Sequence, residues 1–208
     1  LDGDVAMFLH SWRVPQRSES ASFRITPRML LSHTSGLADG LGFPGYKPSE
    51  PLPDTLSILN GVSPAKTVAI GQSLPPMSQS RYSGGGSVVM QQLLMDVTGR
   101  CFPELMRSSL LKPLGMVMST YQQPLEESLR PSAALAHDAK GERLQEPWMI
   151  YPELAAAGLW STSEELAALV RSLQRAASGH VGQPLWECES EISGNRSGLD
   201  PLALDSIY

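Results

Sequence analysis

The sequence predicts a globular, mainly helical domain, and three observations support this prediction. Of the 208 residues, 41% are hydrophobic and 18% are charged, a composition that favours folding around a core over disorder. Helix start and stop signals recur between Thr26 and Gly179. No repeat is present and no long segment alternates between apolar and polar residues, so a large sheet is not expected.

The N-terminal part predicts two short helices. The segment from Leu1 to Leu9 has the pattern of a turn and a short amphipathic helix. Thr26 caps a second helix, which has Pro27 in its first turn and Gly36 after its end. Residues 38–53 are rich in glycine and proline and predict a loop.

The middle of the chain predicts further helices separated by irregular segments. A short helix from Leu52 to Asn60 is closed by Gly61, and residues 62–81 are expected to be irregular with one strand-like run. The next helix has apolar residues at i, i+4 and i+8 and ends at Gly99. These apolar residues are Val89, Leu93 and Val97. Another helix is predicted between Pro103 and Pro113.

The clearest helix signal lies near the C-terminus. The segment from Ser161 to Glu165 contains overlapping capping boxes, and the helix is expected to stop at Gly179. Its apolar face consists of Leu166, Leu169, Val170 and Leu173. Residues 183–208 lose this periodicity, which leaves two interpretations: a tail, or a sequence displaced from its natural continuation.

The charge and the residue types argue against several functions. A net charge of −5 without a basic cluster argues against a nucleic-acid partner. No apolar run approaches the roughly 20 residues that cross a bilayer. Cys101 and Cys188 lack metal-ligand spacing and are expected to be ordinary thiols. No Gly-x-Ser-x-Gly nucleophile elbow occurs, and the lack of a metal-spaced His/Cys set and of a phosphate loop means that no metal and no cofactor is expected. The sequence does not indicate a compartment.

Residues 81–86, Arg-Tyr-Ser-Gly-Gly-Gly, are the strongest candidate for an active-site segment. A tyrosine on a short loop, followed by glycines and then a helix, can present its phenol to a cleft. Because a phenol is a poor base near its ordinary pKa of about 10, proton transfer requires neighbouring cations. The alternative is that Tyr82 is a half-buried aromatic residue that fills a loop-to-helix junction.

Several segments occur in an order known from one family. They are Leu1-Asp2-Gly3-Asp4-Val5, the segment from Ile25 to Leu37, Tyr82-Ser83-Gly84-Gly85-Gly86, Val97-Thr98-Gly99, Lys112-Pro113-Leu114-Gly115-Met116 and Ala157-Gly158-Leu159-Trp160-Ser161-Thr162. Over about residues 1–178 the chain resembles the serine beta-lactamase-related hydrolases. That group includes class C beta-lactamases, D-alanyl-D-alanine carboxypeptidases, D-aminopeptidases and related esterases.

The resemblance implies an α+β fold in which a helical region and an antiparallel sheet enclose a cleft. The chain is expected to hold mainly the helical region, as a partial domain at residues 1–182, with much of the sheet missing and residues 183–208 unassigned. In the family, a Ser-x-x-Lys motif supplies the nucleophile and its lysine, and a Tyr-x-Asn loop supplies a phenol. A Lys or His followed by x-Gly on a strand completes the cleft.

The resemblance places Tyr82 at the catalytic tyrosine, with Ser83 and Gly84 at substrate-binding positions. Gly84 stands where the family usually has asparagine, which counts against beta-lactam specificity. The upstream Ser-x-x-Lys is expected to be absent from this chain.

Two Ser-x-x-Lys pairs occur within the chain, but neither is expected to replace the missing upstream motif. Ser63 and Lys66 follow the His33-Thr34-Ser35-Gly36 segment, whereas the family motif precedes it, and no helix pattern continues beyond Lys66. Ser109 and Lys112 lie at a helix end, where a lysine favours the helix dipole.

Three histidines are interpreted as structural. His33 is expected to be satisfied by backbone contacts in a turn near the cleft. His180, in Gly179-His180-Val181-Gly182, is expected at a helix stop. It is not expected to be the histidine of the family's Lys/His-x-Gly motif, which lies on a strand. His137 and Asp138 predict a surface turn.

The implied function is part of a serine hydrolase that cleaves an amide or ester through an acyl-enzyme, with the nucleophile absent from this chain. Its partner would be a small-molecule, peptide or ester substrate bound by the full-length protein. The alternative is a non-catalytic protein of the same fold that binds a ligand or a partner. A truncated product that exposes apolar surface is the third possibility.

Overall fold

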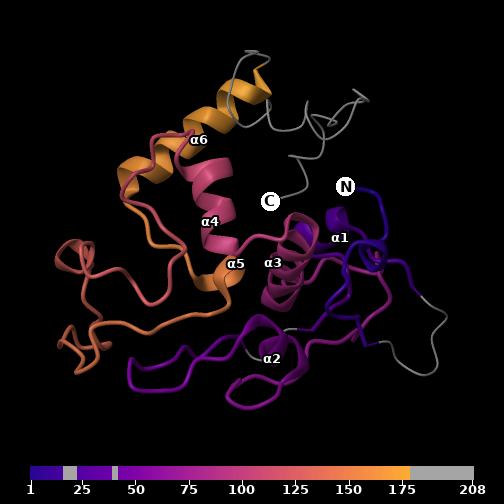
Figure 1. Cartoon of the computed structure of the whole chain (residues 1–208), viewed down its shortest axis with the longest axis horizontal. Coiled ribbons are helices and arrows are strands. Elements are labelled where there is room, and N and C mark those ends of the chain that lie inside the picture. The colour runs from indigo at the N-terminus through magenta and orange to yellow at the C-terminus, as the bar shows by residue number, and fades with distance from the viewer. Residues whose placement is uncertain (16–22, 39–41, 179–208) are drawn as a thin grey trace. The chain divides into compact units, whose positions relative to one another are not determined.

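The protein is described by a computed structural model that covers residues 1–15, 23–38 and 42–178 (Figure 1). Its helical elements are η1 (Val5–Met7), α1 (Pro27–Leu31), α2 (Thr55–Asn60), α3 (Gly84–Thr98), α4 (Phe102–Met106), η2 (Arg107–Leu111), η3 (Arg130–Ser132), α5 (Leu154–Ala157) and α6 (Ser163–Ala177). Within these ranges the β-structure consists of isolated bridges without an extended strand, which agrees with the prediction that no large sheet forms. The strand-like run expected within residues 62–81 is reduced to a single bridge between Gln72 and Leu37. None of the described helices is long and apolar enough to span a membrane.

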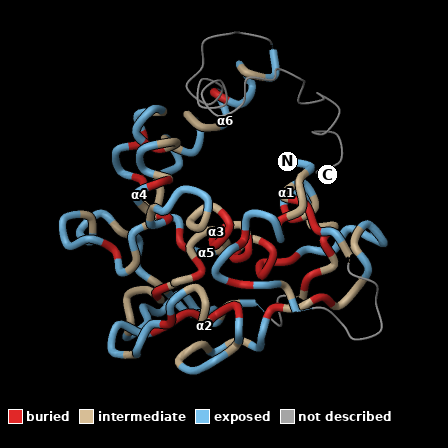
Figure 2. Tube along the Cα trace, turned by 45° about the vertical axis from the view of Figure 1, so that its right-hand side comes forward, coloured by how far each residue is buried: buried red, intermediate tan, exposed pale blue. Residues whose placement is uncertain are grey.

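The chain forms two compact units. Unit 1 contains the described residues of Leu1–Phe102 and Gln122–Leu159, and unit 2 contains Pro103–Tyr121 and residues 160–178. In unit 1, α3 packs against α1, α2 and α5, and Figure 2 shows that buried residues concentrate on it. The core of this unit consists of Val5, Leu9, Trp12, Ile25, Leu30, Leu37, Ile58, Leu59, Ile70, Val88, Val89 and Leu93.

The helices of unit 1 begin at side-chain caps. Thr26 accepts the Met29 N–H and precedes Pro27 in α1, which confirms the predicted start of that helix. Asp54 accepts the Ser57 N–H at 2.7 Å, so α2 begins at Thr55, three residues later than Leu52. The helix ends as predicted at Gly61, which adopts a left-handed conformation with φ 61°.

The prediction for α3 is wrong in two respects. The helix begins at Gly84, so the three glycines form its first turn instead of a loop before it. Val88, Val89 and Leu93 are buried, but Val97 is 57% exposed because the last turn of α3 extends beyond the core. Gly99 ends the helix as expected, with φ 65°.

A buried glutamine connects α3 to two distant parts of unit 1. The side-chain amide of Gln91 donates to Thr55 Oγ1 at 3.1 Å and to the Pro152 carbonyl at 3.4 Å. Its carbonyl oxygen accepts the Ala155 N–H at 3.0 Å. This one residue therefore holds the start of α2 and the start of α5 against the centre of the unit.

Glu153, which precedes α5, is fully buried. Neither carboxyl oxygen has a hydrogen-bond partner among the described residues. Burial raises the pKa of this carboxyl above its ordinary value of 4.5, and the positive charge of Lys66 offsets only part of that effect. Burial thus makes Glu153 harder to ionise than an exposed glutamate.

Asp96, near the end of α3, binds the backbone of His10 and Ser11 in the segment that follows η1. Its carboxylate accepts the backbone N–H groups of His10 at 2.6 Å and Ser11 at 2.8 Å, and Gln92 donates to it at 2.8 Å. Burial by itself raises the pKa of Asp96, but these hydrogen bonds outweigh burial and lower the pKa below 3.8.

In unit 2, α6 begins at Thr162, which accepts the Glu165 N–H as the sequence predicts. The Glu165 carboxylate does not close the capping box but accepts the Met118 N–H at 2.8 Å and the Ser119 hydroxyl at 2.5 Å. The helix is confirmed, but its predicted apolar face is not buried. Leu166, Val170 and Leu173 are 42%, 51% and 53% exposed, whereas Ser172 is the residue that α6 buries.

Several expectations concern residues outside the described ranges. They are the helix stop at Gly179, the segment containing His180, the thiol of Cys188 and the unassigned residues 183–208.

Candidate functional site

Tyr82 lies two residues before α3, next to the capping Ser83, and is 70% exposed. The alternative interpretation as a half-buried filler at this junction is therefore wrong. The ring contact recorded for Tyr82 in the described part of the chain is with His33, at 4.8 Å between ring centroids and an interplanar angle of 41°. Within those same residues, no lysine or arginine lies over the Tyr82 ring, and the one cation–π contact involves Tyr46.

The turn His33-Thr34-Ser35-Gly36 after α1 holds the segment that leads to Tyr82. Four backbone N–H groups of this segment donate to carbonyl groups of the turn. These bonds join Ser73 and Leu74 to Gly36 (2.9 and 3.1 Å), Met77 to Thr34 (2.8 Å) and Arg81 to His33 (2.8 Å). Gly36 has φ 73° and faces the backbone of Leu74, so a side chain would not fit there. The path toward Tyr82 is thus set by the backbone of this turn.

His33 is satisfied by backbone contacts, as the sequence analysis expects. Its Nδ1 accepts the Ser83 N–H at 3.3 Å, so the neutral ring carries its proton on Nε2. Its φ of 55° is in the left-handed region, which histidine adopts more readily than most non-glycine residues.

Ser83 caps α3, and its side chain is buried. Its Oγ accepts the Gly86 N–H at 2.9 Å, and 1% of the residue is exposed. A Cβ on Gly85 would lie 2.7 Å from the Ala38 carbonyl oxygen and 2.7 Å from Ile70 Cδ1. The cap and this close packing explain why a run of poor helix formers begins the helix. Substrate binding by Ser83 and Gly84 stays a prediction, and for buried Gly84 it would involve the backbone.

Lys66 is engaged in contacts that have no connection with Ser63. Its Nζ lies 2.6 Å from Glu50 Oε2 and 3.0 Å from the Gly45 carbonyl oxygen, and 4.6 Å from the centre of the Tyr46 ring. The chain between Ser63 and Lys66 is not helical. This arrangement agrees with the prediction that the pair is not a nucleophile and its activating lysine.

The other candidates also lie in structural positions. Ser109 lies in η2 and Lys112 is exposed directly after it, which confirms the helix-end position. The Asp138 carboxylate accepts the Lys140 and Glu142 N–H groups, which confirms the surface turn next to His137. Among the described residues, no group of three or more His, Cys, Asp or Glu could hold a metal ion.

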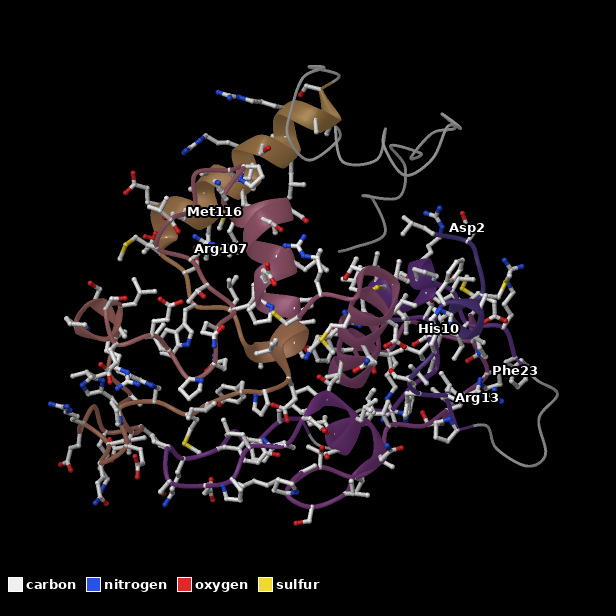
Figure 3. All side chains as sticks on the ribbon, viewed as in Figure 1. Asp2, His10, Arg13, Phe23, Arg107 and Met116 are labelled. Carbon is white, nitrogen blue, oxygen red and sulfur yellow. The ribbon has the colours of Figure 1, made fainter. Side chains whose placement is uncertain are left out.

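A hollow of about 550 Å³ opens at the N-terminal segment, away from the Tyr82 loop in sequence. Its lining includes Asp4, His10, Trp12, Arg13 and Phe23. Figure 3 labels His10, Arg13 and Phe23. The Asp4 side chain caps η1 by accepting the Ala6 N–H. The residues that line this hollow do not include Tyr82, Ser83 or Gly84.

Comparison with known proteins identifies the family. A family model described as Beta-lactamase matches residues 4–193, so the chain belongs to the Beta-lactamase family. No curated protein sequence matches it.

Solved structures share the fold. The chain is similar to EstCE1, a hydrolase with promiscuous acyltransferase activity (TM-score 0.63, 21% identity, 83% of this chain and 51% of that one). It is also similar to the octameric penicillin-binding protein homologue from Pyrococcus abyssi (0.57, 22%, 84% and 39%). A third is D-amino acid amidase from Ochrobactrum anthropi SV3 (0.57, 23%, 77% and 45%). The chain thus has a beta-lactamase/transpeptidase-like fold and spans about half or less of each structure.

The contact between His33 and Tyr82 was not found by sequence reasoning. The two residues are far apart in the chain and share no local pattern. A usable signal was present, since a histidine directly after a helix end and before a Thr-Ser-Gly turn is a candidate for the left-handed conformation.

Proposed function

We propose that this chain forms the tyrosine-bearing wall of a serine hydrolase cleft that cleaves an amide or ester through an acyl-enzyme. The observation that carries the proposal is the exposed Tyr82 phenol, held on a segment whose backbone is bonded to the turn after α1. Membership of the Beta-lactamase family supports the reaction class.

In the proposed reaction a serine hydroxyl attacks the carbonyl carbon of the substrate and loses its proton to a basic group. The tetrahedral intermediate expels the amine or alcohol, which takes up a proton, and water then hydrolyses the acyl-enzyme. Tyr82 takes part in this proton transfer. Backbone N–H groups stabilise the oxyanion.

The proposal requires a nucleophile and a cation that the described residues do not place at Tyr82. Lys66 is paired with Glu50, and the ring contact of Tyr82 is with His33. We therefore propose that both groups come from a Ser-x-x-Lys motif outside this chain. The substrate class is an amide or ester, and Gly84, which has no side-chain amide to orient the substrate, counts against a beta-lactam.

A fluorophosphonate probe tests this proposal on the 208-residue chain. We expect no labelled serine, and the matched variants Ser63→Ala and Ser109→Ala should give the same blank result. Specific labelling of either serine, lost in the corresponding variant, would show that the nucleophile lies in this chain.

The coding sequence adjoining Leu1 provides the second test. A Ser-x-x-Lys motif within a few tens of residues supports the hydrolase, and Tyr82→Phe in that longer product should lower kcat by about 10²- to 10⁴-fold. Unchanged turnover in the variant would remove Tyr82 from the mechanism.

A non-catalytic binding protein of the same fold is the second candidate. The observation that favours it is that no lysine or arginine of the described residues lies over the Tyr82 ring. A complete reading frame without Ser-x-x-Lys would support this candidate over the hydrolase.

A further inference from the structure

We infer that His33 is a positioning residue that sets the orientation of the Tyr82 phenol, an inference that rests on the proposed role of Tyr82 in proton transfer. An exposed tyrosine rotates among several side-chain conformations unless contacts hold it. Tyr82 is 70% exposed, so burial does not restrict it. A group that transfers a proton must nevertheless be held close to its productive geometry.

His33 contacts three consecutive residues of the loop that carries this phenol. Its carbonyl oxygen accepts the Arg81 N–H at 2.8 Å, its ring lies 4.8 Å from the Tyr82 ring, and its Nδ1 accepts the Ser83 N–H at 3.3 Å. The backbone on both sides of Tyr82 and the Tyr82 ring itself are thus held by one residue.

The left-handed backbone of His33 is anchored in α1. The His33 N–H donates to the Leu30 carbonyl at 3.3 Å and the Thr34 N–H donates to the Met29 carbonyl at 2.9 Å. With φ at 55°, the residue leaves the helix with its carbonyl and its ring both reaching the Tyr82 loop. The hydrogen bonds to α1 therefore fix the position of His33, and His33 in turn fixes the position of the Tyr82 loop.

The two ring contacts require different properties of the side chain. The bond from Ser83 requires an acceptor atom, and the contact with Tyr82 requires a flat ring. Asparagine tolerates the left-handed conformation and offers an acceptor but no aromatic ring. Phenylalanine offers the ring without the acceptor, and glycine offers neither. These three substitutions separate the two contacts.

The test uses nuclear magnetic resonance on the 208-residue chain, with the Tyr82 ring signals assigned by Tyr82→Phe. In His33→Gly we expect the Tyr82 ring signals to move to the positions of an unstructured tyrosine and the Ser83 amide to exchange about five to ten times faster. The Arg81 amide should stay protected, because the backbone carbonyl of residue 33 is retained.

The conservative variants distinguish positioning from a general loss of structure. His33→Asn should keep slow exchange at Ser83 and lose the Tyr82 ring shift, and His33→Phe should do the reverse. The matched control His137→Asn, at an exposed histidine, should change neither signal. Tyr82 ring signals that stay unchanged in both His33→Gly and His33→Asn would overturn the inference.

These measurements need no turnover, so they test the contact independently of the hydrolase proposal. If the ring signals respond as expected but Tyr82→Phe keeps full activity in a longer product, the proposed catalytic role fails while the orienting contact stands. If the ring signals do not respond, His33 does not position Tyr82, whatever the activity of the protein.

Discussion

The buried carboxyl of Glu153 leads to a pH-dependent prediction for Glu153→Gln. A buried group with no hydrogen-bond partner costs about 1–3 kcal/mol, and more when it is charged. Both oxygens of Glu153 are in this situation, and burial raises the pKa of the carboxyl above 4.5. The folded state therefore binds a proton more tightly than the unfolded state does.

The direction in which the stability of the wild type changes with pH follows from proton linkage. Because the folded state binds more protons, the free energy of unfolding of the wild type falls as the pH rises from 4.5 through the raised pKa of Glu153. The slope contributed by this one group is at most about 1.4 kcal/mol per pH unit. The amide of Glu153→Gln does not titrate, so the variant lacks this loss of stability.

Urea denaturation at a series of pH values between about 4 and 8 measures the difference between the two proteins. We expect Glu153→Gln to match the wild type at the acidic end and to be more stable by about 1–3 kcal/mol at the alkaline end. Glu127→Gln is the control, because the Glu127 side chain is 90% exposed and should show no such trend. A stability difference that does not change with pH, or that decreases as the pH rises, would refute the reasoning.

Three further predictions concern packing and hydrogen bonds. Gly85→Ala should lower the free energy of unfolding by about 1–3 kcal/mol because its Cβ would meet backbone at 2.7 Å. Gly86→Ala, whose Cβ has only ordinary contacts from 3.5 Å, should raise it by up to about 1 kcal/mol; equal effects in thermal denaturation would contradict this. Asp96→Asn should cost about 1–2 kcal/mol at neutral pH, and because the pKa of Asp96 is lowered, the difference should vanish as the pH falls below 3.8. Glu165→Ala, which removes the acceptor oxygen, should expose the Met118 amide to faster hydrogen exchange, and unchanged protection there would argue against the bond between them.

The sequence predicts best those features that depend on neighbouring residues. The starts of α1 at Thr26 and of α6 at Thr162 follow from caps that lie within three residues of their partners. The start of α3 was missed because glycine is a poor helix former, and only contacts with distant Ala38 and Ile70 explain Gly85.

Features that depend on distant residues were not predictable. Val97 continues the apolar spacing of its helix, yet it is exposed because the core ends before the last turn. Nothing local marks Glu153 as buried, since its environment is formed by other segments. In the candidate site, the pattern identified Tyr82, whereas its contact with His33 depends on how the turn after α1 meets the loop.

The discontinuity of unit 1 has a consequence for synthesis on the ribosome. The chain leaves this unit after Phe102 and returns at Gln122, and Gln91 finds two of its partners only at Pro152 and Ala155. At a synthesis rate of about 5–20 residues per second, α3 waits several seconds for these partners to emerge. During that interval the side-chain amide of Gln91 bonds to water instead, so the packing of α3 against α5 forms only after residues 152–157 have been synthesised.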